Sequence, residues 1–193
     1  MATTVIKDIK GIPDNSDNQS RRSLLITSLI RFFSLPDNLN IFLNVINGKG
    51  KTSLRLLDWL ITNYAKANNI IYNVNSGGTV KSFNVYLNYK TQLKAYSKRQ
   101  FDPFQRRERI SFYIEDENNE SKQIITTIGQ LNFFRWAIQN DILIYAERHL
   151  KDIEHDMNHS IQQRKNVLNK SRIKRKDISS TIIQQHPRDQ ITF

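Results

Sequence analysis

The sequence predicts an α+β fold, in which a small antiparallel sheet or hairpin packs on three to four helices between flexible termini. Residues 127–145 are the densest apolar and aromatic segment and show helical spacing. Residues 109–114 and 123–127 are short β-branched and aromatic runs separated by an acidic, polar stretch, which is typical of a hairpin. We expect one domain at residues 20–168, preceded by a flexible leader at residues 1–19 and followed by a basic, polar tail at residues 169–193.

The first expected element after the leader is a helix. Ser20 is a candidate cap for it, and the helix is expected to run to about Phe33 and to be ended by Pro36. The face expected to be buried contains Leu24, Leu25, Ser28, Leu29 and Phe32.

The middle of the chain predicts a second helix followed by strands. Thr52 or Ser53 caps an amphipathic helix that ends at Asn68. Residues 83–89 alternate in polarity as a strand does, although residues 85–97 also fit a helix. The other expected elements are a strand at 70–74, a turn at 76–78, and the hairpin at 109–127, which could serve as the wing of a winged-helix-like fold.

The helix that begins at residue 127 is expected to organise the fold. Thr127 and Gln130 form a capping box, in which each side chain can bond a backbone N–H of the first turn. Trp136 is expected towards the flank of the helix, and a second helix, about residues 146–168, either continues it or follows a bend. The expected apolar stripe is Leu131, Phe134, Ile138, Ile142 and Tyr145.

The composition favours a polyanionic partner. Lys and Arg number 29 against 18 Asp and Glu, giving a formal charge of +11, so nucleic acid is the expected partner class, DNA ahead of RNA. The absence of cysteine excludes disulfides, thiolate zinc fingers and a cysteine nucleophile. The apolar run at residues 24–35 is too short and too polar to span a bilayer, and we find no signal peptide, so an intracellular protein is expected.

Three patterns could carry chemistry, and each has a simpler interpretation. Residues 47–53 resemble a phosphate-binding loop, but that loop requires a glycine where Val45 stands, so a helix cap is favoured. His155 and His159 lie one helical turn apart and lack a third metal ligand. The carboxylates at residues 115–120 fit a solvated hairpin tip. We therefore predict no enzyme activity, catalytic residue, metal site or cofactor.

Residues 90–109 form the first candidate nucleic-acid-binding segment. Basic groups neutralise phosphates, and the interleaved rings of Tyr96, Phe101 and Phe104 can stack on exposed bases. In the alternative interpretation, Phe101 and Phe104 anchor the loop in the core while the charges are only solvated. The candidate binding residues are Lys90, Lys94, Tyr96, Lys98, Arg99, Arg106, Arg107 and Arg109.

Residues 164–176 form the second candidate segment, with seven basic residues and no acidic one. Its residues 173–176 also resemble a nuclear-localisation or polyanion-binding patch. The candidate binding residues are Arg164, Lys165, Lys170, Arg172, Lys174, Arg175 and Lys176.

Four stretches together resemble a conserved family of small basic proteins of nucleocytoplasmic large DNA viruses, the giant viruses. They are residues 51–59 (KTSLRLLDW), 101–110 (FDPFQRRERI), 126–138 (TTIGQLNFFRWAI) and 152–158 (DIEHDMN), and the resemblance covers roughly residues 50–160. The high Ile, Asn and Lys content fits an AT-rich viral genome. The resemblance implies a viral setting without an assigned activity or known catalytic residues.

These observations lead to ranked functional hypotheses. The first is a non-enzymatic nucleic-acid-binding protein of a large DNA virus, acting in genome packaging, virion organisation or transcription. The second is an internal minor capsid or other structural virion protein, and the third is a nucleotide-binding enzyme built on the loop at 47–53. The expected locations are the host cytoplasm or viral factory, the nucleus, and the virion.

Overall fold

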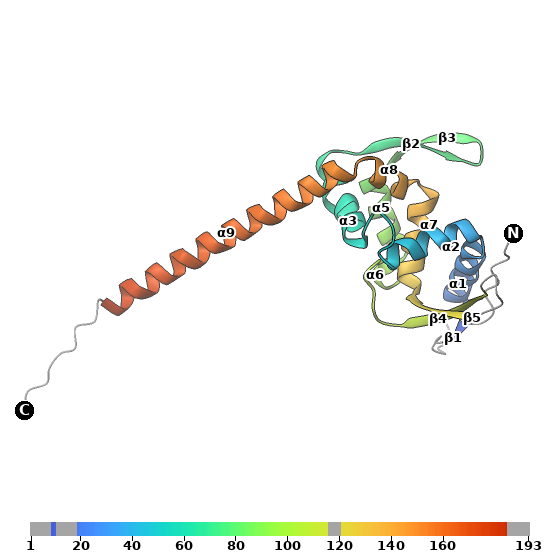
Figure 1. The fold of residues 1–193 in the computed structure, drawn as a ribbon, viewed down its shortest axis with the longest axis horizontal. Helices are drawn as coiled ribbons and strands as arrows, with labels where there is room; N and C mark the ends of the chain where they lie inside the picture. The colour runs from blue at the N-terminus through green and yellow to red at the C-terminus, as the bar shows by residue number, and fades with distance from the viewer. Residues whose placement is uncertain (1–8, 11–18, 116–120, 185–193) are drawn as a thin grey trace, which may run out of the picture. The chain divides into compact units, whose positions relative to one another are not determined.

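The computed structural model describes residues 9–10, 19–115 and 121–184, and it confirms the α+β class (Figure 1). Most of the predicted leader, the tip of the hairpin at 116–120 and residues 185–193 lie outside the described residues. The chain divides into two compact units, residues 1–153 and residues 154–193. The single domain expected at residues 20–168 stays a prediction. No helix in the described part of the chain is long and apolar enough to cross a membrane.

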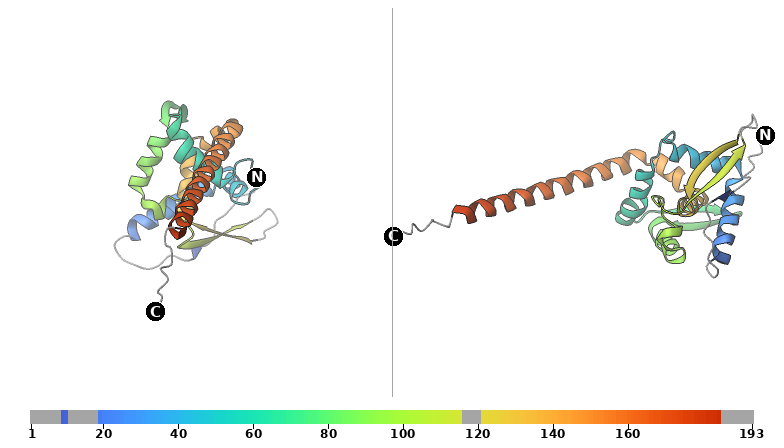
Figure 2. Two further views of the ribbon diagram at one scale, coloured as in Figure 1. Left: turned by 90° about the vertical axis from the view of Figure 1, so that its left-hand side faces the viewer. Right: turned by 90° about the horizontal axis from the view of Figure 1, so that it is seen from below.

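The described residues of the first unit form two small antiparallel sheets. In one, the order is β1–β4–β5, with Arg109 of β4 opposite Thr127 of β5, which confirms the predicted hairpin. In the other, β2 pairs with β3 across Gly77 and Gly78, whose φ angles of +59° and +82° fit the type I′ turn that closes a two-residue hairpin. Figure 2 shows the β4–β5 hairpin beside the first helix. The strands are β1 (Ile9–Lys10), β2 (Ile71–Ser76), β3 (Thr79–Asn84), β4 (Arg109–Glu115) and β5 (Ser121–Thr127).

The described residues form more helices than the sequence indicated, because caps and turns interrupt the apolar patterns. The predicted second helix contains one π-helical turn, η1 (Leu60–Tyr64), between two α-helical parts. The α-helices are α1 (Gln19–Phe33), α2 (Pro36–Ile46), α3 (Leu54–Trp59), α4 (Ala65–Ala67), α5 (Val85–Ala95), α6 (Ser97–Gln100), α7 (Ile128–Gln139), α8 (Ile142–Arg148) and α9 (Leu150–Gln184).

The structure corrects the N-terminal helices. Ser20 lies inside α1, and the buried side of α1 is shifted from the predicted one, so that Leu24 is 68% exposed. Pro36 does not only follow α1 but also begins α2, because proline fits the first helical turn, where no N–H partner is needed. The buried residues of α1 are Leu25, Ile26, Leu29 and Phe33.

The strand predicted at residues 83–89 is wrong beyond its first two residues, and the helical alternative is correct. The Asn84 side chain accepts a hydrogen bond from the Leu87 backbone N–H at 2.9 Å, and this cap starts α5. In the same way, Ser53 accepts from the Leu56 N–H at 3.2 Å and starts α3, as predicted.

Helix α7 is the centre of the first unit, as the sequence indicated. Phe134 is fully buried, and α7 contacts α1, α2, α6 and α8 (Figure 1). Trp136, expected at the flank, is 4% exposed and donates its Nε1–H to Asn88 Oδ1 at 2.7 Å. The predicted continuous helix over 127–145 is wrong, because Asp141 adopts a left-handed conformation with φ +54° and separates α7 from α8.

Candidate nucleic-acid interface

The seven basic residues of the segment 90–109, called the basic surface below, are all exposed. They come from four consecutive pieces of chain: α5, α6, the loop at 101–108, and the first residue of β4. They are Lys90, Lys94, Lys98, Arg99, Arg106, Arg107 and Arg109.

The loop at 101–108 is anchored on the first turns of α7. The Phe101 ring is fully buried and lies 5.5 Å from the Trp136 ring. Gln130 Nε2 donates to the Pro103 carbonyl at 3.1 Å, and Asn132 Nδ2 donates to the Gln100 carbonyl at 2.9 Å. The loop backbone is therefore held by side chains of the central helix.

The predicted capping box is half formed, and its second half anchors the loop instead. Thr127 Oγ1 accepts from the Gln130 N–H at 3.1 Å, as predicted. The Gln130 side chain accepts a hydrogen bond from Thr126 Oγ1 at 2.7 Å and donates to Pro103. Gln130 thus takes part in the cap that starts α7 and also holds the loop that contains Arg106 and Arg107.

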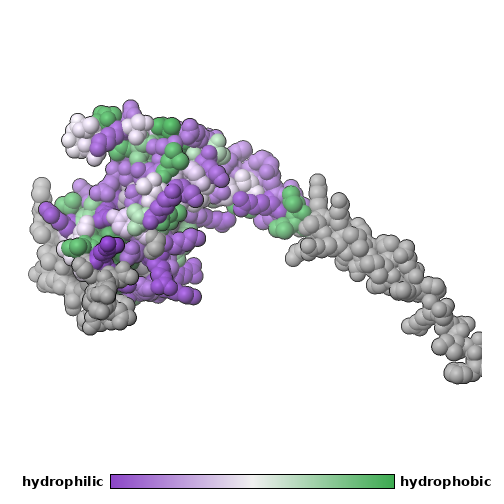
Figure 3. Space-filling model, turned by 180° about the vertical axis from the view of Figure 1, so that it is seen from behind, coloured by the Kyte–Doolittle hydropathy of each residue, from purple (hydrophilic) through white to green (hydrophobic). Residues whose placement is uncertain are grey.

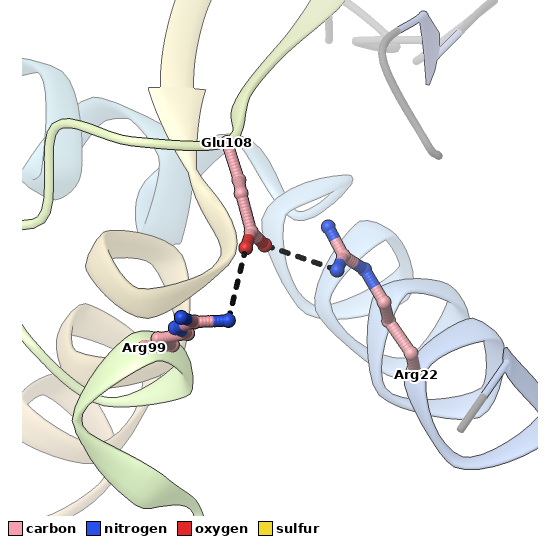
Figure 4. Close-up of polar contacts among 3 residues, drawn as sticks. All are labelled: Arg22, Arg99 and Glu108. Atoms are coloured by element: carbon pink, nitrogen blue, oxygen red, sulfur yellow. Dashed lines mark ion pairs between the residues drawn. The ribbon is translucent and has the colours of Figure 1, made fainter. Parts of the chain in front are cut away.

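Both carboxylates of the segment 90–109 have structural partners. Asp102 Oδ1 accepts from the Phe104 N–H at 2.8 Å and closes a tight turn. Figure 4 shows the Glu108 carboxylate between Arg22 of α1, at 3.0 Å, and Arg99 of α6, at 3.9 Å. Glu108 has a φ of +56°, a conformation that non-glycine residues adopt at some cost in free energy.

The other cations of the loop region have no such partner. Within the described residues, no carboxylate forms an ion pair with Lys98, Arg106, Arg107 or Arg109. The side chains of these four residues are exposed.

A small group of ionisable residues lies near the basic surface. Burial raises the pKa of Tyr89 to about 12, and the charges of Asp58 and Asp102 add to the shift. Burial also raises the pKa of the Asp58 carboxyl, with a further contribution from Asp102. Tyr89 is therefore a neutral phenol at physiological pH, and its ring packs 6.0 Å from Phe101.

The three aromatic residues of the segment differ in exposure. Phe101 is in the core, as the anchoring interpretation required, but Phe104 is 43% exposed and that interpretation is wrong for it. Tyr96 is half-buried, and its ring stacks on Phe101 with centroids 6.2 Å apart. The sequence does not show which of the three rings is exposed, because all three lie between the same basic residues.

The second basic segment lies on a helix. α9 continues past residue 168 to Gln184, so much of the segment predicted as a tail is helical. Arg164 and Lys165 are exposed. The same helix carries Lys170, Arg172, Lys174, Arg175 and Lys176, whose side chains lie outside the described part of the structure.

Comparison with known proteins gives a family without an assigned activity. The model of a family of unknown function, DUF7197, matches residues 7–192. The chain belongs to this family. A relative, Uncharacterized protein L507 of Acanthamoeba polyphaga mimivirus, is 43% identical over 141 residues, which are 72% of this chain and 54% of that protein. The chain thus spans about half the length of this curated relative.

These comparisons confirm the expected giant-virus origin and unassigned function. No solved structure matches the chain.

The loop at 47–53 of the DUF7197 chain does not have the geometry of a phosphate-binding loop. It follows helix α2 instead of a strand, and the N–H groups of Lys49 and Gly50 both donate to the Asn44 carbonyl, at 2.8 and 2.9 Å. Thr52, which would reach a magnesium ion, is buried, and its Oγ1 has no hydrogen-bond partner among the described residues. The loop is a helix cap, which is the simpler interpretation of the sequence.

The histidine pair remains a two-residue arrangement. The rings of His155 and His159 lie parallel, 6.2 Å apart, on α9, and both side chains are exposed. Across the described residues, no group of three or more His, Cys, Asp or Glu side chains is placed to hold a metal ion.

Proposed function

We propose that this DUF7197 chain is a non-enzymatic nucleic-acid-binding protein of a large DNA virus. Its basic surface would contact backbone phosphates, with DNA the more favoured partner, in genome packaging, virion organisation or transcription. This role places it in the viral factory, the host cytoplasm or the nucleus, and in the virion if it stays with the packaged genome.

The observation that supports the proposal is the pairing and exposure of the charged side chains in the segment 90–109. Of its two carboxylates, Asp102 accepts a backbone hydrogen bond and Glu108 forms an ion pair with Arg22. The loop cations Arg106 and Arg107 are exposed. Exposed arginines attract phosphates and can bind them through two parallel hydrogen bonds. The formal charge of +11 strengthens the attraction.

The anchored backbone of the loop supports the same function. A hydrogen bond from Gln130 holds the loop, and one from Asn132 holds Gln100, the last residue of α6 before the loop, before any ligand arrives. Binding therefore requires less ordering of the loop, which reduces the entropic cost of association.

The experiment is a salt titration of DNA binding by the full chain. Phosphate contacts release counterions, so log K should fall with log[salt] at a slope of about 0.9 per duplex phosphate contacted. The triple variant Arg106→Gln, Arg107→Gln, Arg109→Gln should flatten the slope by about 0.9 for each phosphate that these arginines neutralise. Neutralising Lys174, Arg175 and Lys176 tests the α9 segment separately.

A matched control removes three charges elsewhere. Arg31→Gln, Lys81→Gln, Arg148→Gln takes exposed cations from α1, β3 and α8 and changes the net charge equally. Equal flattening by both triple variants would show that binding depends on net charge alone. A wild-type protein that does not bind DNA at low ionic strength would reject the proposal and leave a structural role in the virion as the better hypothesis.

A further inference from the structure

Phe104 stands out among the aromatic residues of this chain. Among the described Phe, Tyr and Trp side chains, it is the one that is exposed, at 43%. The other exposed large apolar side chains of the described residues are aliphatic, and all of them lie outside the loop at 101–108. Figure 3 shows one face of the molecule on which hydrophobic residues form small separate patches in a largely hydrophilic surface.

The exposure of Phe104 follows from how its neighbours are fixed. Phe101 and Pro103 are buried, and the Pro103 carbonyl accepts from Gln130. The Phe104 N–H is bonded to Asp102 Oδ1, and the Gln105 N–H donates to the Asp102 carbonyl at 3.2 Å. The turn thus presents the ring at the surface, although the core of the same unit buries several other phenylalanines.

Basic residues flank Phe104 on both sides in the sequence. Lys98 and Arg99 precede it, and Arg106 and Arg107 follow it, all exposed. An aromatic platform beside groups that bind phosphate is the combination that single-stranded nucleic acid requires, because its bases have open faces. In a duplex these faces are stacked and closed to a side chain.

We infer that Phe104 is a stacking site for an unpaired base, and that the preferred ligand of the basic surface is single-stranded nucleic acid. The inference rests on the proposed function and specifies its ligand. It assigns the stacking role to Phe104 ahead of Tyr96, whose side chain is half-buried and whose ring lies 6.2 Å from the Phe101 ring.

The first measurement compares variants on two probes, a 20-nucleotide oligo-dT and a 20-base-pair duplex. Phe104→Ala should weaken oligo-dT binding about 5- to 150-fold, which corresponds to ~1–3 kcal/mol for one stacked base. The salt slope and the duplex affinity should stay at the wild-type values, because no charge is removed. Phe104→Leu should behave like Phe104→Ala, and Phe104→Tyr should retain binding, because only the latter keeps an aromatic face.

The matched control is Leu87→Ala on α5, which removes an apolar side chain that is 63% exposed. It should leave both affinities unchanged. In a second measurement, Phe104→Trp places a fluorescent ring at the site, and oligo-dT should quench it beyond the change seen for the native Trp59 and Trp136 in the wild-type protein.

The outcomes separate the inference from the function on which it rests. No binding of either probe by the wild-type protein rejects the proposed function. Salt-dependent binding that Phe104→Ala leaves intact rejects the stacking site alone. An equal loss on oligo-dT and duplex also rejects it, since the ring would then act through the shape of the loop.

Discussion

Replacing Gly129 by alanine tests whether the central helix positions the basic loop. A Cβ atom at Gly129 would lie 2.8 Å from the Arg99 carbonyl oxygen and 3.2 Å from both the N and O atoms of Asp102. All three are backbone atoms, so no side chain can rotate away. The loop would have to shift, and the hydrogen bonds from Gln130 and Asn132 would lengthen.

The expected effect on stability is a balance of opposing contributions. Alanine is favoured over glycine in a helix by ~1 kcal/mol, whereas overpacking costs ~1–3 kcal/mol and each weakened hydrogen bond ~1 kcal/mol. With both hydrogen bonds weakened, the net loss is therefore about 2–4 kcal/mol, a fall in Tm of roughly 4–16 °C for a chain of this size. Thermal unfolding followed by circular dichroism measures it.

Gly50→Ala is the control for this experiment. A Cβ at Gly50 would lie 3.6 Å from the Asn44 carbonyl oxygen, an ordinary van der Waals distance, and the backbone there does not require glycine. Its Tm should stay near the wild-type value. If Gly129→Ala unfolds at or above the wild-type temperature, the close packing of α7 against the loop is not what stabilises this region.

Three further predictions concern the core, the half-buried Asp58 carboxyl and the glycine-rich loop. Phe134→Ala should lose ~3–5 kcal/mol of unfolding free energy in denaturant titrations, because the ring is fully buried; wild-type stability would show that α7 is not the core. Asp58→Asn should raise the Tm at pH 7, because the raised pKa means that the ionised carboxylate is disfavoured in the folded state; the gain should shrink as the pH falls and disappear below 3.8, and a lower Tm at pH 7 would contradict this. Lys51→Ala should leave the ATP affinity of the wild-type protein unchanged in calorimetry, since the loop N–H groups are used in the helix cap; tight Mg²⁺-dependent ATP binding that this variant abolishes would overturn the non-enzymatic proposal.

The sequence by itself determined the elements whose signals are local. These signals depend on residues within one or two helical turns or on adjacent strands. They are the Thr127 cap, the amphipathic pattern after Ser53, and the β-branched runs at 109–114 and 123–127. The exposure of the seven cations at 90–109 also followed from the sequence, because a charged side chain avoids burial unless it is paired. At 83–89, strand and helix patterns both fitted, and the Asn84 cap shows which of them the chain adopts.

Only the tertiary structure decided how the basic segment is arranged. Phe101 and Phe104 are equally apolar and three residues apart, yet one is buried against α7 and the other exposed. Glu108 pairs with Arg22, which is far away in the sequence. From another helix, the amide of Gln130 bonds to the loop and the amide of Asn132 bonds to the end of α6. Local sequence patterns reflect interactions between residues that are close in the chain. Burial and charge pairing depend instead on which distant element packs against a residue. For this reason the stacking site at Phe104 emerged from the packing of α7 against the loop.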